Sequence, residues 1–475
     1  MKNYILKIIA VSLLIPYSIS CESALDEEVF SELTTETFLN TEEGLRTVLN
    51  SSYSNVQYIS GGFAWFYTLS AMPSGESYNR GGTVEAFFTP LSNFTWDSNL
   101  ELLNFAWNKP YEAIRDANIL LDNIDNEALN GEYRKLLSAE ARFIRGYAYT
   151  TLYDYFGATP IFDSSEPTNL TRPRSTDEEM RNFIETDFLS AAENLPISQE
   201  EYGRATKGSA LGLLCKFYLN TAQWQKSADT AMEIMNMQTY SLVPDYKDVF
   251  SLANEGNSEM LWVHARTAIG GRHELNQFIF PTDYPFLPNK GTYAARIYLF
   301  DDFVNSFEED DQRLNLIVTN YINRNGEEIQ LLGNDQSLPA KYEFDSDATG
   351  NGDGNDFPVV RYADILLARA EALNELNGPS TEAIDLINQV RARSGVSLIG
   401  LNEFNDANAL RSRIQQEREW EFYAEVKRRE DQKRFGNFIS LAQQRGKNAK
   451  DFQVLFPIPE REIDANPNLN QNSGY

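Results

Sequence analysis

Apolar residues recur at helical spacing in residues 356–395, which have the sequence DFPVVRYADILLARAEALNELNGPSTEAIDLINQVRARSG. One apolar stripe consists of Ala363, Leu366, Leu367, Ala370 and Leu373, and a second consists of Ala383, Ile384, Ile387 and Val390. Gly378 and Pro379 separate the stripes, as expected where one helix ends and the next begins. Two antiparallel helices across residues 361–394 match the 34-residue period of the tetratricopeptide unit. Because such a unit cannot bury its stripes alone, the pattern predicts further helix pairs stacked on this one.

The same periodicity predicts helices in several other parts of the chain. They cover residues 41–57, 107–124, 133–155, 180–195, 206–220, 225–237 and 408–435. Residues 206–220 and 225–237 are separated by a short turn, so they are expected to form another tetratricopeptide-like pair. The pattern therefore predicts a mainly α fold, in which tetratricopeptide-like helix pairs form an α-helical scaffold.

Two long regions do not follow this periodicity. Residues 58–104 are rich in glycine, serine, asparagine and aromatic residues, and residues 240–342 combine turns with short β-prone runs at 259–264 and 315–322. Residues 452–475 contain much proline and asparagine, which indicates an extended tail. Long irregular segments in ordered proteins often carry function. We therefore expect irregular loops and a few short strands to build a ligand face on the scaffold.

Composition narrows the possible functions. The chain has 475 residues and a formal net charge of −28, which argues against polyanionic partners such as nucleic acids, because they require clustered lysine and arginine. His264 and His273 are the only histidines, and no nucleophile elbow, phosphate-binding loop or metalloprotease motif is present. The sequence therefore favours a binding protein over an enzyme, with no catalytic residue and no required cofactor.

The N-terminus predicts a targeting segment that ends at a cysteine. Lys2 and Lys7 flank the start of an apolar run at residues 8–19, which is too short and too interrupted to span a bilayer permanently. Cys21 follows at the place where a bacterial lipobox has its lipidated cysteine. The alternative is an ordinary secretory signal with a chance cysteine. Cys215, the other cysteine, lies in an apolar segment and is predicted to be a small buried hydrophobe.

Several long motifs resemble the SusD/RagB family of outer-membrane lipoproteins for nutrient uptake. They are EARFIRGYAYTTLYDYFGATP at 140–160, GRATKGSALGLLCKFYLNTAQW at 203–224, NDFPVVRYADILLARAEALNE at 355–375 and LFPIPEREIDANPNLNQNSGY at 455–475. Residues 417–435 resemble a further family block, matching it at Glu417, Arg418, Glu421, Phe422, Glu425, Arg428, Asp431 and Arg434. Val426, Gln432 and Phe435 depart from the glycine, leucine and tryptophan of that block.

The resemblance implies a function and a domain organisation. Family members are surface lipoproteins of Gram-negative bacteria that cover a SusC-type, TonB-dependent transporter in the outer membrane and capture oligosaccharides or other nutrients. Residues 1–20 would be the lipoprotein signal peptide, and residues 21–235 and 236–475 would form N-terminal and C-terminal regions of one compact body. Two alternatives remain: a tetratricopeptide-type scaffold that binds peptides, and a glycan hydrolase.

A sugar site should combine aromatic rings, on which sugar faces stack, with polar groups that bind hydroxyls. The irregular regions supply such residues, but the family's loops diverge, so no role is transferred residue by residue. The candidates are Trp65, Tyr67, Tyr78, Arg80, Trp96, Tyr284, Phe286, Asn289 and Tyr293. Trp96, between Asn93 and Asp97, is the preferred platform, and the alternative for each candidate is a packing role.

Two charged segments allow a further interpretation. Residues 345–356 resemble an EF-hand loop, in which a structural calcium ion would be held by Asp345, Asp347, Thr349, Asn351, Asp353 and Asp356. The alternative is a plain acidic turn. In residues 417–434, charges three and four positions apart predict a structural ion-pair network rather than acid–base chemistry, with Glu425 paired to Arg428 and Arg429, and Arg428 paired to Asp431.

Overall fold

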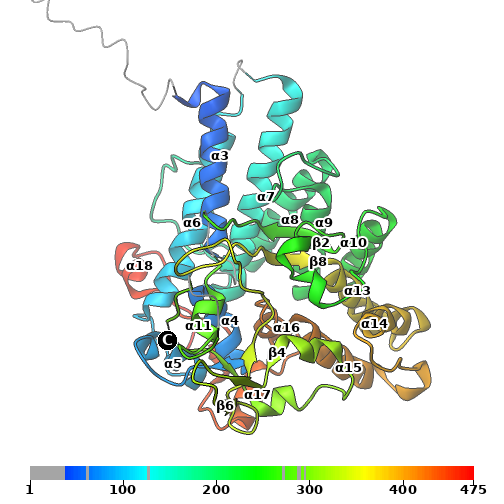
Figure 1. Ribbon diagram of the computed structural model, residues 1–475. Helices are drawn as coiled ribbons and strands as arrows, with labels where there is room; N and C mark the ends of the chain where they lie inside the picture. Colours follow the sequence, from blue (N-terminus) through cyan, green and yellow to red (C-terminus); the bar gives the residue numbers. More distant parts are fainter. Residues whose placement is uncertain (1–37, 60–63, 126–128, 270–272, 286–289, 294–295) are drawn as a thin grey trace, which may run out of the picture.

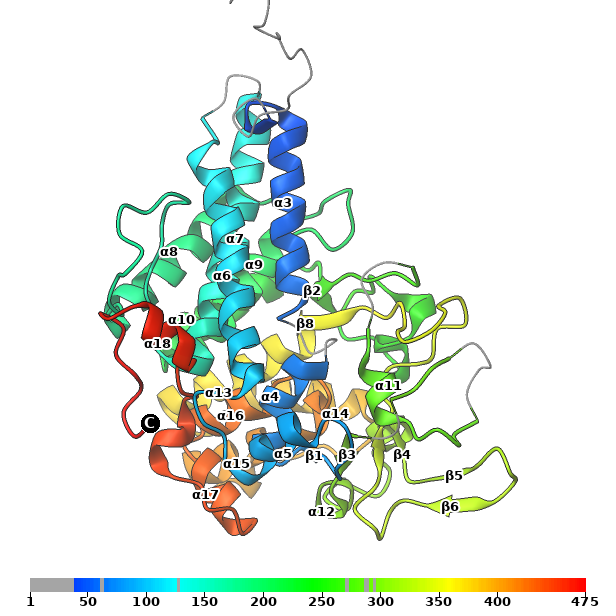
Figure 2. The ribbon, with the colours of Figure 1, turned by 90° about the vertical axis from the view of Figure 1, so that its left-hand side faces the viewer.

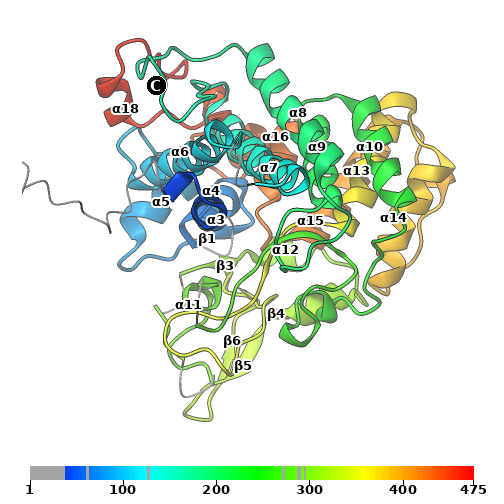
Figure 3. The ribbon, with the colours of Figure 1, turned by 90° about the horizontal axis from the view of Figure 1, so that it is seen from above.

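A helical scaffold forms one side of the protein. The computed structural model describes residues 38–59, 64–125, 129–269, 273–285, 290–293 and 296–475. The scaffold helices are α3 (Glu42–Gln57), α6 (Glu101–Asp122), α7 (Gly131–Phe156), α8 (Asp177–Asn194), α9 (Lys207–Asn220), α10 (Trp224–Asn236), α13 (Tyr362–Asn377) and α14 (Thr381–Arg393). Each packs against the next in this order, and Figure 3 shows them crossing the molecule from α3 to α14. The prediction of stacked helix pairs is confirmed.

Local signals set the ends of the helix pair at residues 361–394. The Ser380 hydroxyl accepts a hydrogen bond from the Ala383 backbone amide at the start of α14, which satisfies one of the unpaired amides of the first turn. Gly378 ends α13 with a φ of 76°, a conformation that favours glycine. Arg391 and Arg393 stand in the last turn of α14, where positive charges suit the carbonyl end of a helix. The two apolar stripes pack together in one cluster with Leu410, Ile414 and Phe422.

The prediction that residues 58–104 have no helix was wrong. The segment contains α4 (Ala64–Ser74) and α5 (Glu85–Asn93). Ten of the eleven residues of α4 are buried, so the helix has no solvent-facing stripe and shows no amphipathic period. The helix predicted at 408–435 is also divided, into α15 (Ala407–Phe422) and α16 (Arg428–Arg434). The division falls at Ala424 and Val426, which have left-handed φ angles of 60° and 62°.

Short strands and loops form the other side of the protein. The strands pair antiparallel in twos: β1 (Ser77–Tyr78) with β3 (Tyr298–Leu299), β2 (Met260–His264) with β8 (Phe357–Arg361), β4 (Ile317–Val318) with β7 (Leu338–Pro339), and β5 (Asn320–Ile322) with β6 (Glu328–Gln330). The β5–β6 hairpin extends away from the helices in Figure 2. The remaining helices are α11 (Leu275–Ile279), α12 (Asp301–Val304), α17 (Phe438–Gln444) and, within the otherwise extended tail, α18 (Glu460–Ala465).

A buried ion-pair network joins the two sides. The Arg361 guanidinium lies 2.6 Å from a carboxylate oxygen of Glu259 and 2.6 Å from one of Glu421, and Glu421 also pairs with Arg313 and Arg393. Burial by itself would raise the pKa of Glu421, but the three guanidiniums hold it well below its usual value. Because breaking a buried pair leaves an uncompensated charge, the network is expected to fix how the helices meet the loops.

The charged run at 417–434 is structural, but the partners predicted within it were wrong. Glu425 pairs with Arg361 and Lys341 instead of Arg428 and Arg429. Asp431 pairs with Arg418 and with Arg434. The remaining two arginines reach Glu419 and Asp154, respectively. Apart from the Asp431–Arg434 pair within α16, these side chains pair with residues of other elements, because tertiary packing brings charges from distant segments close to them.

Candidate ligand-binding surface

Four aromatic side chains form a first cluster between helices α3, α4, α5 and α6. The cluster, named here the Trp65 cluster, consists of Tyr58, Trp65, Phe87 and Phe105. The Trp65 and Phe87 rings stack with centroids 5.6 Å apart and an interplanar angle of 24°, and Phe105 meets the edge of Trp65 at 6.0 Å. Tyr58 is 44% exposed, while the other three rings are partly buried. Partly exposed rings of this kind can present faces to a ligand.

A second cluster forms where strands β1 and β3 pair. This Tyr298 cluster consists of Tyr78, Tyr298 and Phe300, all half-buried. Tyr78 stacks on Phe300 with ring centroids 4.7 Å apart and lies 5.8 Å from the Tyr298 ring. The Tyr78 hydroxyl donates a hydrogen bond of 2.6 Å to the Asp335 carbonyl oxygen. That bond and the strand pairing hold the rings in a fixed arrangement, which reduces the entropy lost on binding.

Arginine side chains stand beside the Tyr298 cluster. Burial raises the pKa of the Tyr298 hydroxyl, and the positive charges of Arg80 and Arg296 partly oppose that rise. The Asn79 side chain donates a hydrogen bond to the Arg296 carbonyl oxygen at 2.9 Å. A Cβ atom at Gly82 would overlap the Arg296 guanidinium, so glycine is needed for this close approach. The cluster thus combines ring faces with cationic hydrogen-bond donors.

Helix α5 connects the two clusters. The chain passes beside Arg296 at Gly82, just before α5 begins, and Phe87 in the first turn of α5 belongs to the Trp65 cluster. Helix α4 contacts both α5 and β1. Figure 2 shows α4, α5, β1 and β3 together below α3 and α6. We take the two clusters as the candidate ligand-binding surface.

The candidates from the second irregular region lie near this surface or outside the described residues. Tyr293 is 39% exposed, its ring lies 4.7 Å from Phe278, and its hydroxyl accepts a hydrogen bond from Asn351. Tyr284 is half-buried against Phe280 and Tyr321. Phe286 and Asn289 fall outside the described residues. Phe278 contacts both Tyr293 and Phe88 of α5, so one buried ring links Tyr293 to the helix that connects the two clusters.

The structure turns two candidates into packing residues. Trp96 is only 5% exposed, its indole N–H donates to the Tyr475 hydroxyl at 2.8 Å, and its ring lies between Phe94 and Phe456. Tyr67 is fully buried on α4 and donates to a carboxylate oxygen of Glu76 at 2.8 Å. The choice of Trp96 as a platform was therefore wrong, because the C-terminal tail covers the ring.

The structure does not assemble the predicted calcium loop. The carboxylate of Asp353 pairs with Lys290 at 2.8 Å, that of Asp345 accepts from the backbone amides of Asp347 and Gly354, and that of Asp356 accepts from Tyr202 and the Arg266 amide. The side-chain amide of Asn351 donates to Tyr293 instead. In the described parts of the chain, no three histidine, cysteine, aspartate or glutamate side chains are grouped to hold a metal ion. The geometry is that of the acidic turn.

The cysteine and the two histidines that the structure describes lie in the interior. Cys215 is buried, as predicted, and burial raises the pKa of its thiol to about 12. His264 and His273 are buried as well, and burial holds their pKa values well below the usual range. An inert thiol and two neutral imidazoles that solvent does not reach are typical of packing side chains.

Sequence reasoning missed Tyr58, Phe87, Phe105, Tyr298 and Phe300. A weak signal existed for two of them, because Tyr298 and Phe300 are separated by one residue and would share a strand face. Their partner strand begins more than two hundred residues earlier, at Ser77, and nothing local indicates that pairing. Phe87 and Phe105 lie in or beside segments that were predicted to be irregular.

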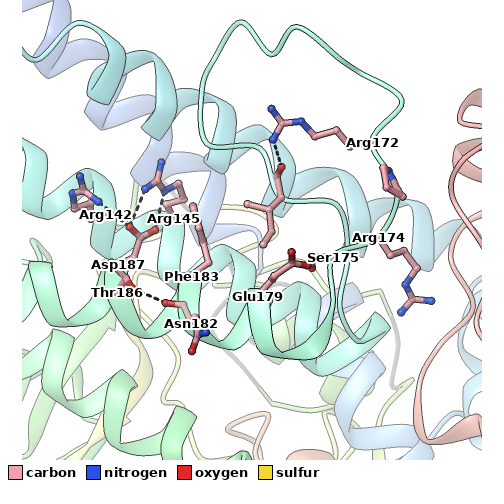
Figure 4. A pocket seen from close by; sticks show the side chains of 12 residues that line it. Arg142, Arg145, Arg172, Arg174, Ser175, Glu179, Asn182, Phe183, Thr186 and Asp187 are labelled. Atoms are coloured by element: carbon pink, nitrogen blue, oxygen red, sulfur yellow. Dashed lines mark hydrogen bonds and ion pairs between the residues drawn. The ribbon is translucent and has the colours of Figure 1, made fainter.

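An arginine-lined hollow on the scaffold is a second possible site. It has a volume of about 620 Å³ and lies against α7, α8 and residues 172–175. Figure 4 shows Arg142 and Arg145 reaching the same carboxylate, that of Asp187. Arg172 donates to the Ile161 carbonyl oxygen, and Arg174 donates to the carbonyl oxygens of Phe156 and Ala158. These arginines already have internal partners, so the hollow is a weaker candidate than the aromatic surface.

The stacked helix pairs place the protein in the class of helical-repeat proteins. Residues 337–475 match the SusD family, and residues 25–219 match a family described as starch-binding and associating with the outer membrane. The chain belongs to the SusD family, also called SusD/RagB, as its motifs predicted. Membership groups it with binding proteins rather than enzymes. Among the described residues, no helix is long and apolar enough to cross a membrane.

Individual relatives extend over nearly the whole chain. A SusD-like protein of Formosa agariphila is 29% identical, with 96% of this chain and 97% of the relative aligned. The crystal structure of a SusD homolog from Bacteroides thetaiotaomicron superposes with a TM-score of 0.80 at 25% identity, covering 94% of this chain and all of that one. Surface glycan-binding protein A of the same organism, solved with laminarihexaose, gives a TM-score of 0.77 at 19% identity over 91% of this chain and 99% of that one.

Proposed function

We propose that this protein is a nutrient-binding lipoprotein that captures oligosaccharides at the cell surface and delivers them to a partner TonB-dependent transporter. The observation that carries the proposal is the pair of half-buried aromatic clusters on either side of α5. Sugar rings have apolar faces that stack on aromatic rings, while their hydroxyls require polar groups nearby. A structural relative in complex with laminarihexaose supports the choice of glycans as the ligand class.

The lipid anchor belongs to the same proposal. Cys21 lies outside the described residues, and the support for its acylation is its position after the apolar run at residues 8–19. Cys21→Ala should release the protein from the membrane fraction, because acyl chains would supply the anchoring. The fractionation should include a high-salt wash and a strain that lacks the partner barrel, so that binding to the transporter is not mistaken for lipidation. Retention of the variant under those conditions would contradict the anchor.

The binding function is tested with the purified soluble domain and a glycan panel. Tyr298→Ala should weaken binding of any bound glycan by at least about tenfold, since stacking on an aromatic ring is typically lost with the ring. Tyr153→Ala is the matched control, because Tyr153 is also half-buried but lies on α7, outside both clusters. Equal binding by the wild type and the Tyr298 variant would show that the surface is not the binding site.

The same samples separate the two alternatives. A glycan hydrolase would release shortened products during the incubation, which chromatography of the ligand detects. A peptide-binding scaffold would bind through its helices, so its binding would survive Tyr298→Ala. Delivery to a transporter predicts that an outer-membrane barrel co-purifies with the protein after mild detergent extraction.

A further inference from the structure

Arg80 and Arg296 lie just beyond the paired strands of the Tyr298 cluster. Strands β1 and β3 pair Ser77 with Leu299 and Tyr78 with Tyr298. When this antiparallel register is continued by two residues, Arg80 stands opposite Arg296. The hydrogen bond from the Asn79 side chain to the Arg296 carbonyl oxygen shows that the two segments remain adjacent there. Because side chains alternate along an extended chain, Arg80 and Arg296 share a face with the two tyrosines.

Like charges at opposed positions repel each other, and folding does not favour that arrangement by itself. The chain has 69 acidic residues and only 41 lysines and arginines, so carboxylates to neutralise a cation are abundant. Arg80 is nevertheless exposed and forms no hydrogen bond or ion pair with any residue that the structure describes. An exposed guanidinium that has no partner among the described residues and lies beside an aromatic stack can take part in ligand binding.

Two carboxylates near the cluster accept hydrogen bonds from backbone amides. Asp301 and Asp335 each accept a hydrogen bond from the backbone amide of the other, at 2.8 and 3.1 Å. Both carboxylates lie near Tyr78, since their charges affect its hydroxyl. Burial raises the pKa of Tyr78, the two carboxylates raise it further, and Arg80 opposes the rise. On the Tyr298 side, the charges that act on the hydroxyl are those of Arg80 and Arg296.

We propose that the Tyr298 cluster binds an anionic glycan, one whose sugars carry carboxylate or sulfate groups. The net charge of −28 argues against polyanions over the surface as a whole, whereas Arg80 and Arg296 are a local pair of cations that would recognise the charge. The guanidinium is planar and donates parallel hydrogen bonds that fit carboxylate and sulfate oxygens. The adjacent rings of Tyr78, Tyr298 and Phe300 would hold the apolar face of the same or the next sugar. This inference depends on the proposed glycan-binding function and adds a ligand class to it.

The test compares glycans that share a backbone and differ only in charge. Calorimetric titration with oligogalacturonate and its methyl ester tests carboxylate recognition, and titration with sulfated galactan oligosaccharides and their desulfated form tests sulfate recognition. Laminarihexaose serves as the neutral reference. We expect the charged member of one pair to bind at least about tenfold more tightly than its neutral counterpart. The preference should shrink as salt is raised from 50 to about 500 mM, because salt screens exposed charges.

Variants then assign the preference to the two arginines. Arg80→Gln should reduce binding of the charged glycan by about tenfold and leave neutral glycans unaffected, with an unchanged melting temperature because the side chain has no protein partner. Arg296→Gln should have the same effect on binding. Lys247→Gln is the matched control: Lys247 is another exposed cation, on the short helical turn at residues 247–249, and it changes the net charge by the same amount.

The outcomes separate this inference from the proposed function. Equal binding of charged and neutral glycans that is lost in Tyr298→Ala but kept in Arg80→Gln would overturn the inference and leave glycan binding intact. A charge preference that Lys247→Gln reduces as much as Arg80→Gln would also overturn it, because the effect would then be one of net charge. Binding of no member of any pair would count against both the inference and the proposed function.

Discussion

Replacing Trp96 with alanine should strongly destabilise the protein, because the ring joins the C-terminal tail to the body. Trp96 is 5% exposed, its ring centroid lies 4.7 Å from that of Phe94 and 5.1 Å from that of Phe456, and its N–H donates to Tyr475 at 2.8 Å. Removing a buried tryptophan ring typically costs about 3–5 kcal/mol. The loss of the Trp96 hydrogen bond should add no separate cost beyond this range, because the Tyr475 hydroxyl still donates its own hydrogen bond to the Leu455 carbonyl oxygen.

The magnitude can be divided with two milder variants. Tyr475→Phe keeps both rings but removes both hydrogen bonds of the Tyr475 hydroxyl, the one from Trp96 and the one to Leu455, so it should cost about 1–3 kcal/mol. Trp96→Phe keeps much of the packing and should fall between Tyr475→Phe and Trp96→Ala. Urea unfolding, monitored by far-UV circular dichroism because tryptophan fluorescence changes with the substitution, measures the free energy of unfolding of each of the three variants. The values are comparable if the slope of free energy against urea concentration is the same in all of them.

The same variants distinguish packing from ligand contact. Because the tail covers the ring, Trp96→Ala should bind glycans as the wild type does at temperatures where it remains folded. A variant with wild-type stability and lost glycan binding would refute the packing role and restore Trp96 as a ligand platform. A small loss of stability with unchanged binding would refute the estimate from burial.

Two further predictions concern the link between α15 and α16 and the ion-pair network beside it. Val426 has a left-handed φ of 62°, a conformation that penalises any Cβ atom, so Val426→Gly should be more stable than Val426→Ala by about 1 kcal/mol in urea unfolding. In an ordinary helix or strand the order would be the reverse. A Val426→Ala variant more stable than Val426→Gly would contradict the left-handed geometry. Burial raises the pKa of Glu421 and of Glu425, but the neighbouring cations outweigh burial, so both folded-state pKa values are lower than usual. The stability that these carboxylates contribute is therefore fully present above the unfolded-state pKa of about 4.5, and it is lost as the pH falls through the lower folded-state pKa values. Glu421→Gln should therefore cost about 3–5 kcal/mol near neutral pH, and the difference from the wild type should narrow between pH 5 and 3; a difference that stays constant over that interval would show that Glu421 does not titrate with folding.

The sequence by itself determined the helical scaffold. Helix periodicity is a local property, so the stripes in residues 361–394 predicted α13 and α14, and Gly378 and Pro379 predicted the boundary between them. The same reasoning located α7 to α10 within a few residues. It also found Tyr78 and Arg80 as candidate ligand contacts, because they lie in an irregular segment rich in aromatic and polar residues.

Only the tertiary structure decided which aromatic rings are exposed to a ligand and which charged residues pair with one another. Trp96 and Tyr78 look equivalent along the chain, yet the last residue of the protein covers Trp96, and a strand from the middle of the chain positions Tyr78. Glu425 has arginines three and four positions away but pairs with Arg361 and Lys341. Burial and charge pairing depend on contacts between segments far apart in sequence, and no local period records which segments will meet.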